Sequence, residues 1–199
     1  MQSDKPSTTD SKKSQTSSKS LRNFLDEATA HLRTALDQKI ELLLTGDERA
    51  YREFLQRTAL VILPLEHALE AADVTSVVTD WPARRRSDAL IGDLRLLRVT
   101  VPERQSFNVP GSEARLLGML YVLEGTRPGA EHLLRIVSNH GSVLIKHATA
   151  YLSHGAGESL WQSFLERLEG SHHAHAERDA TLAGATLVLT MYDAAFSSI

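Results

Sequence analysis

Apolar residues recur at spacings of three and four along most of the chain, and this period predicts amphipathic helices. The first predicted helix runs from about Ser20 to Leu44, and the second from about Asp47 to Ala72. Pro64 lies inside the second helix, where we expect it to kink or split the helix because proline removes a backbone donor. Further helices are predicted over residues 87–99, 112–139, 158–169 and 173–196, with a short helical piece before Tyr151.

The pattern between these helices shows no run of strict alternation with hairpin turns and no repeat of fixed period. Residues 74–83 are too short and isolated to indicate a sheet, and we expect a connector there. The sequence therefore predicts an all-α fold, a bundle of about seven helices that forms a single domain over residues 21–199. In bundles of this kind, ligand sites lie between facing helices.

Composition separates residues 1–20 from the rest of the chain. This segment holds seven Ser, three Thr and four Lys, and no large apolar residue after Met1. Such a segment does not bury enough apolar surface to offset the entropy lost on ordering. We therefore expect a disordered tail over residues 1–20.

Composition also excludes several classes of function. The chain has 199 residues, a net charge of -3 and no cysteine. The absence of cysteine excludes disulfides, thiolate metal sites and a cysteine nucleophile. The charge indicates no nucleic-acid or membrane partner, and no apolar run approaches the roughly 20 residues of a membrane span. No apolar leader is evident, so we expect a cytoplasmic protein.

One predicted helix is interrupted in its middle. The stretch Met119–Leu134 is apolar at both ends, but Gly125, Pro128 and Gly129 disfavour a helix between them. A helix that breaks and then resumes usually has a local reason for the break. Gly125 and Gly129 are four residues apart, so they lie on one face and allow a close approach to the backbone. A flat, apolar ligand suits such a face, and a plain loop between two helices is the alternative.

The other polar clusters give weaker indications of a catalytic or metal site. Arg84–Arg86 stands near a helix start, and we expect a solvated face there. His172, His173 and His175 are expected to lie at an exposed helix start. Only Glu169 and His172 have the Glu-x-x-His spacing, whereas a carboxylate di-metal site in a bundle needs several such groups. Serine-nucleophile, phosphate-loop and His-Glu-x-x-His motifs are absent.

Several sequence segments, in the same order along the chain, resemble those of the heme oxygenases. The resemblance is strongest to the bacterial group found beside bacteriophytochromes. The most specific string is Tyr121–Gly125 within the segment Leu117–Leu134. Weaker matches lie over Leu25–Asp37 and Asp80–Leu97. Further matches occur at Tyr151–Ser153, at Trp161 and Phe164, and in the Ala-rich last helix, so the resemblance covers roughly Leu21–Phe196.

The resemblance implies a heme oxygenase-like fold in which heme lies between a proximal first helix and a kinked distal helix. A proximal histidine would ligate the iron, and Gly125, Thr126, Gly129 and Ala130 would form the distal wall. Family members use an electron donor, such as a ferredoxin-like reductant, to convert heme to biliverdin, carbon monoxide and ferrous iron. Heme would be both substrate and cofactor.

This sequence departs from the family pattern at both walls. Arg33 occupies the position of the proximal histidine, three residues before Leu36-Asp37, and arginine has no lone pair for iron. His31 is the nearest histidine, but two residues turn a helix by about 200°. On the distal side, Ala130 replaces the second glycine of the usual pair, and Pro128 precedes it.

Three hypotheses follow. The first is a working heme oxygenase in which His31 or another histidine binds the iron and Arg33 pairs with a heme propionate. The second is a non-catalytic protein of this fold, with Arg33 in place of the proximal histidine, that binds another apolar ligand or a protein partner. The third is a plain helical bundle with no small-molecule role.

Overall fold

The computed structural model describes residues 20–43, 47–103, 107–109, 111–140 and 142–197, so the predicted disordered tail lies outside it apart from Ser20. These residues form helices and connections without any strand, which confirms the all-α class. Seven helices have ten or more residues: α1 (Leu21–Leu43), α2 (Glu48–Ala71), α5 (Ser87–Leu96), α6 (Glu113–Gly125), α7 (Arg127–His140), α9 (Leu160–Gly170) and α11 (Arg178–Ser197). The short helices are α3 (Val74–Val77), α4 (Trp81–Arg84), α8 (Val143–His147) and α10 (His172–Ala176).

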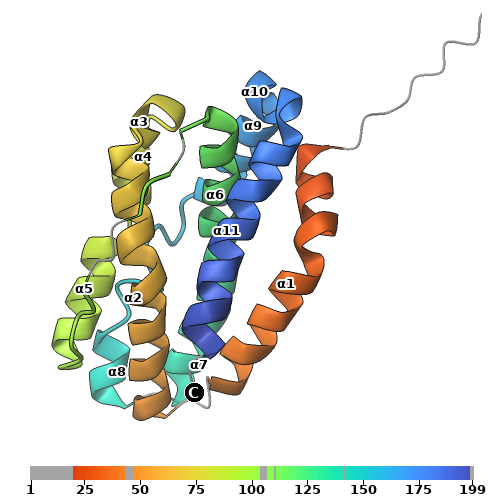
Figure 1. Cartoon of the computed structure of the whole chain (residues 1–199). Coiled ribbons are helices and arrows are strands. Elements are labelled where there is room, and N and C mark those ends of the chain that lie inside the picture. The colour runs from red at the N-terminus through yellow and green to blue at the C-terminus, as the bar shows by residue number, and fades with distance from the viewer. Residues whose placement is uncertain (1–19, 44–46, 104–106, 110, 141, 198–199) are drawn as a thin grey trace, which may run out of the picture.

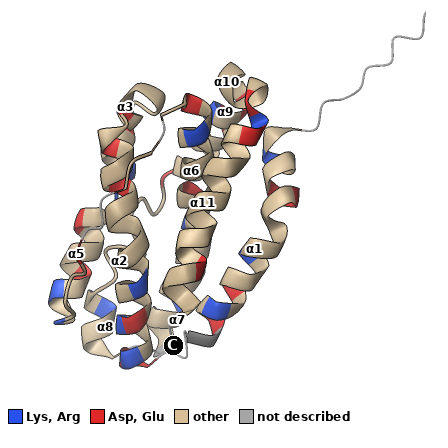
Figure 2. Ribbon diagram, in the orientation of Figure 1, with Lys and Arg blue, Asp and Glu red and all other residues tan. Residues whose placement is uncertain are grey.

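Helix α11 lies at the centre of the bundle and packs against α6, α1 and α2 (Figure 1). Its sequence is uncharged from Ala180 to Tyr192, and Figure 2 shows long uncharged stretches along both α11 and α6. Helix α5 packs against α2. The core is therefore built where α11 meets its three long neighbours, because uncharged helix faces gain most from burial.

Two glycines bring the backbones of α6 and α11 together. A Cβ atom on Gly118 would lie 1.8 Å from the carbonyl oxygen of Thr181. A Cβ atom on Gly184 would lie 2.2 Å from the carbonyl oxygen of Arg115. Only glycine permits so close a crossing, and the crossing fixes α6 in the middle of the bundle.

Two sequence predictions need correction. Helix α2 runs unbroken through the buried Pro64, so the predicted split there does not occur. The surrounding residues of α2 are buried in the core, and packing of this face holds the helix together despite the missing donor. The expected connector over residues 74–83 contains the one-turn helices α3 and α4, whose Val77 and Trp81 are buried. None of the helices in the described ranges is long and apolar enough to cross a membrane.

Candidate functional site

A cavity of about 620 Å³ lies between α1 on one side and α6 and α7 on the other, with α2 and α11 contributing to its wall. Its surface is mostly apolar, and this part is formed by Leu36, Ile40, Phe54, Val122, Leu133, Ile136, Leu152, Leu189 and Phe196. A volume of this size is within the usual range of small-molecule sites, about 300–1,000 Å³. The cavity is therefore the candidate binding site.

The cavity brings together five of the six residues that the sequence singled out, namely Arg33, Gly125, Thr126, Gly129 and Ala130. His31 is the exception, because it is exposed on α1 and is not part of the lining. The helical rotation of about 200° over two residues explains this placement. The histidine that does line the cavity within the described part of the chain is His132, which is exposed on α7.

Arg33 is held on the cavity wall by two neighbours. Its guanidinium forms an ion pair with Asp26, seven residues or about two helical turns earlier on α1. It also lies over the ring of Tyr121 on α6, with 5.7 Å between the guanidinium carbon and the ring centroid. The Tyr121 hydroxyl donates to the same carboxylate of Asp26. Arg33, Asp26 and Tyr121 thus connect the α1 wall to the α6 wall.

The charges of this triad are stabilised by its hydrogen bonds. Burial raises the pKa of Asp26, but donation from Tyr121 and Arg33 outweighs burial and leaves the pKa below its ordinary value. Burial likewise lowers the pKa of Arg33, but the interaction with Asp26 more than compensates and raises it. Arg33 therefore remains a cation and offers no lone pair to a metal.

The interruption of the distal helix is confined to one residue, Thr126, between the end of α6 and the start of α7. Pro128 occupies the first turn of α7, where the missing N–H has no partner within the helix in any case. Pro128 therefore does not disturb the start of α7. A Cβ on Gly129 would meet nothing within 4 Å, whereas a Cβ on Gly125 would contact the Trp161 ring at 3.6 Å.

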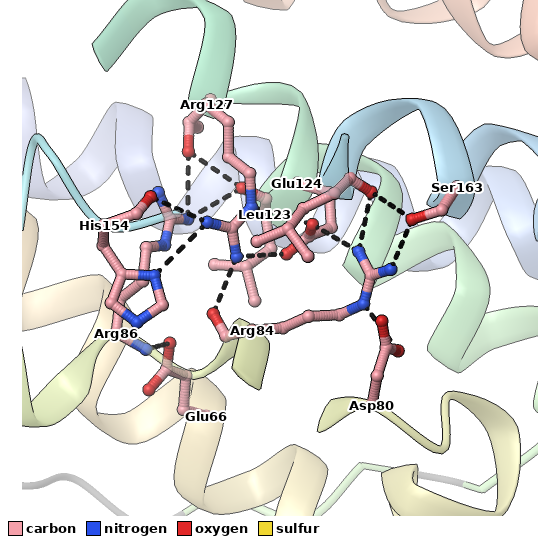
Figure 3. A network of polar contacts seen from close by, with 11 residues as sticks. Glu66, Asp80, Arg84, Arg86, Leu123, Glu124, Arg127, His154 and Ser163 are labelled. Carbon is pink, nitrogen blue, oxygen red and sulfur yellow. Dashed lines mark hydrogen bonds and ion pairs between the residues drawn. The ribbon is translucent and has the colours of Figure 1, made fainter. Parts of the chain in front are cut away.

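A buried network of charges fixes the two helices at this break (Figure 3). Glu124, the penultimate residue of α6, is fully buried and accepts from the guanidinium groups of Arg84 at 2.7 Å and Arg127 at 2.8 Å. Arg127 also donates to the carbonyl oxygen of Arg84 at 2.7 Å. Arg84 reaches α9 through the carbonyl oxygen of Leu160 at 2.8 Å. One carboxylate therefore ties α4, α6, α7 and α9 together.

Arg86 satisfies the carbonyl that the break leaves free. Its guanidinium donates to the carbonyl oxygen of Leu123 at 2.8 Å and to the hydroxyl of Thr126 at 3.0 Å, and the Thr126 hydroxyl also donates to Leu123. Its backbone N–H donates to Glu66 at 2.8 Å. These contacts act as a cap on the last turn of α6 and explain how a helix end is tolerated inside the protein.

The expectation of a solvated face at Arg84–Arg86 is wrong for Arg84 and Arg86, which are 2% and 1% exposed. Three adjacent cations are usually solvated, but here two of them complete buried hydrogen-bond networks. The sequence feature that pointed to their burial was the position of both arginines between the apolar residues Trp81 and Leu90. His172 and His173 are exposed as expected, whereas His175 is half-buried with its Nε2 2.9 Å from the carbonyl oxygen of Glu169. The described residues contain no group of three or more His, Cys, Asp or Glu able to hold a metal ion.

Comparison with known proteins defines the class of the chain. It is 33% identical over 144 residues to a heme oxygenase of Xanthomonas campestris pv. campestris (strain 8004), an alignment that covers 70% of this chain and 84% of the relative. No protein-family model matches the chain. The extent and identity of this match place the chain in the heme oxygenase family.

Solved structures agree with the fold. The NO- and CO-bound heme oxygenase of Neisseria meningitidis aligns with a TM-score of 0.71 at 17% identity, over 90% of this chain and 91% of the other. The heme oxygenase of Leptospira interrogans aligns with a TM-score of 0.70 at 18% identity, over 90% of this chain and 100% of the other. The predicted heme oxygenase-like bundle is therefore confirmed.

Proposed function

We propose that this protein binds a heme-type tetrapyrrole in the cavity between α1 and α6–α7, without an iron ligand from α1. The observation that carries the proposal is the cavity itself, a mostly apolar space of about 620 Å³ that contains Arg33 and the predicted distal residues Gly125, Thr126, Gly129 and Ala130. Family membership supports a tetrapyrrole as the ligand.

The residues present fit one part of heme and not another. The apolar lining and the open space at Gly129 suit the flat body of a porphyrin. Iron ligation from α1 does not fit, because Arg33 is a cation held by Asp26 and Tyr121, and His31 is exposed outside the lining. The proposal therefore includes binding and no step of oxygen chemistry.

Titration with hemin and with iron-free protoporphyrin IX, followed by absorbance and fluorescence, tests the proposal. Gly129→Leu should abolish binding, since its side chain would enter open space at the cavity wall without meeting protein. Gly92→Leu is the matched control, because Gly92 is an exposed helical glycine on α5 whose Cβ also meets nothing within 4 Å. A wild-type protein that binds neither porphyrin would refute the proposal.

A second candidate function is oxygen-dependent cleavage of heme to biliverdin, carbon monoxide and ferrous iron. The match to a relative named heme oxygenase favours it. Heme would supply the oxygen-binding iron, and His132 is the histidine that lines the cavity within the described residues. Biliverdin formation from hemin with ascorbate, or with ferredoxin and its reductase as electron donor, tests this candidate. An unchanged hemin spectrum after many minutes with reductant and oxygen would exclude it. An association of this protein with a bacteriophytochrome, which the resemblance implies, stays a prediction.

A further inference from the structure

A second pocket, of about 360 Å³, lies between the start of α7 and the segment 151–159. Ala130, Tyr151 and Leu152 line both this pocket and the cavity between α1 and α6–α7, so they form a wall common to the two spaces. Tyr151 and Leu152 are themselves buried. Whatever holds this segment in place therefore also closes one side of the cavity.

The segment is a series of turns with few ties to the rest of the protein. Its start is anchored where the backbone N–H groups of Ala150 and Tyr151 donate to Asp93 at 3.1 and 2.8 Å. Among the described residues, the hydrogen bonds that join residues 152–158 to another element all come from Arg127. The first residue of α7 is therefore the hydrogen-bonding hold on this segment beyond its anchored start.

The contact between Arg127 and His154 is specific in its geometry. Nη1 of Arg127 donates to the carbonyl oxygen of His154 at 3.3 Å and lies 3.5 Å from Nδ1 of the same residue. A Cβ atom on Gly155 would lie only 3.2 Å from this Nη1, so the backbone also packs closely on the guanidinium. A guanidinium can only donate, so Nδ1 must accept and the ring must be neutral with its proton on Nε2.

The charges around His154 also oppose its protonation. Arg127 on α7 and Arg86 at the start of α5 lie beside the ring (Figure 3). Glu158 and Glu124 are the neighbouring carboxylates, but Glu158 is exposed and Glu124 is already paired with Arg127. Burial, followed by the charges of Arg127 and Arg86, holds the pKa of His154 below its ordinary value of 6.5.

We propose that His154 and Arg127 form an acid-sensitive latch, which holds residues 152–157 against the start of α7 and closes the shared wall of the cavity. Protonation would set an N–H group against the Nη1 donor and a second positive charge beside Arg127. The latch is therefore intact above about pH 6.5 and is lost as the pH falls through the folded pKa of His154. The latch itself goes beyond the proposed function, and only its effect on ligand release rests on that function.

Hydrogen–deuterium exchange of the full chain, followed by mass spectrometry at about pH 7.5 and about pH 5.5, tests the latch without any ligand. After correction for the intrinsic pH dependence of exchange, amides of residues 152–158 should exchange about threefold or more faster at the lower pH. His154→Gln should remove this difference, because its side-chain carbonyl accepts from Arg127 and does not titrate. His172→Gln is the matched control, since His172 is exposed on α10, and it should behave as wild type.

Release of protoporphyrin IX into excess serum albumin then tests the effect on the cavity. Wild type should release the porphyrin about threefold or more faster than His154→Gln at the lower pH and at the same rate at the higher pH. Comparison of the two proteins at one pH cancels the effect of pH on the porphyrin itself. The same pH dependence of exchange in wild type and His154→Gln would overturn the latch. Equal release rates at the lower pH would overturn its action on the cavity. A wild type that binds no porphyrin would refute the proposed function, and the exchange experiment would still decide the latch.

Discussion

Replacement of Arg33 by histidine is the most informative perturbation of the cavity. Arg33 lies on the α1 face that lines the cavity, whereas His31 is exposed outside it. An imidazole at position 33 would project from the same backbone position, and neutral imidazole is a good iron ligand. We therefore expect Arg33→His to convert hemin bound without a ligand from α1 into histidine-ligated heme.

The fold should tolerate this change. The side chains of Arg33 and Asp26 are 36% and 35% exposed, and ion pairs with that much solvent access contribute less than about 1 kcal/mol. Asp26 keeps the hydroxyl of Tyr121 and the guanidinium of Arg22 as partners after the substitution. For a chain of this length, such a loss lowers the melting temperature by at most about 4 °C.

The assay is a hemin titration of Arg33→His followed by absorbance, with resonance Raman spectroscopy to detect an iron–histidine bond. Arg33→Gln is the matched control, because it removes the same cation and supplies no imidazole. His31→Ala should leave the spectrum of Arg33→His unchanged. If folded Arg33→His gives the same hemin spectrum as Arg33→Gln, position 33 does not face the iron and the placement of the ligand in this cavity is wrong.

Three further predictions concern stability and pH. Glu124→Gln should lower the free energy of unfolding by about 3–5 kcal/mol, measured by urea denaturation, because two buried cations lose their carboxylate; the exposed Glu131→Gln should have little effect. Gly184→Ala should cost about 1–3 kcal/mol, since its Cβ would lie 2.2 Å from a carbonyl oxygen of α6, whereas Gly92→Ala should be neutral or stabilising; equal melting temperatures would contradict the close crossing. The pKa of Asp26 lies below its ordinary value of 3.8, so its contribution is present above about pH 4 and is lost as the pH falls through the folded pKa. Asp26→Asn should therefore be slightly less stable than wild type at pH 7 and equal to it near pH 2.

The position of the cavity could be predicted from local sequence because its walls carry local signals. Gly125 and Gly129 are spaced to lie on one helix face, and the apolar period continues on both sides of them. Position 33 was identified through the heme oxygenase resemblance, by its place three residues before Leu36-Asp37, and it also lines the cavity. Such signals depend on neighbours within a few residues, and the sequence contains them directly.

The buried arginines could not be predicted in the same way. The exposure of Arg84 and Arg86 depends on Glu124, Leu123 and Leu160, which lie some 37 to 76 residues further along the chain. The residues close to Arg84 in the sequence do not identify those partners. The crossing of α6 and α11 at Gly118 and Gly184 is similarly non-local, because each glycine is needed only when the other helix is in place.

The two walls of the cavity differ in how strongly the fold depends on them. The wall at α6–α7 is fixed by a buried network in which Glu124, Arg84 and Arg127 join four helices, so substitutions there should disturb the whole bundle. The wall at α1 carries Arg33, whose ion pair with Asp26 is partly exposed to solvent, so this side chain should contribute little to stability. Substitution at position 33 should therefore cost the fold little and leave the cavity in place. If the proposed tetrapyrrole binding holds, the cavity should therefore support binding whatever residue stands at position 33, and that residue should decide only whether iron has a ligand from α1.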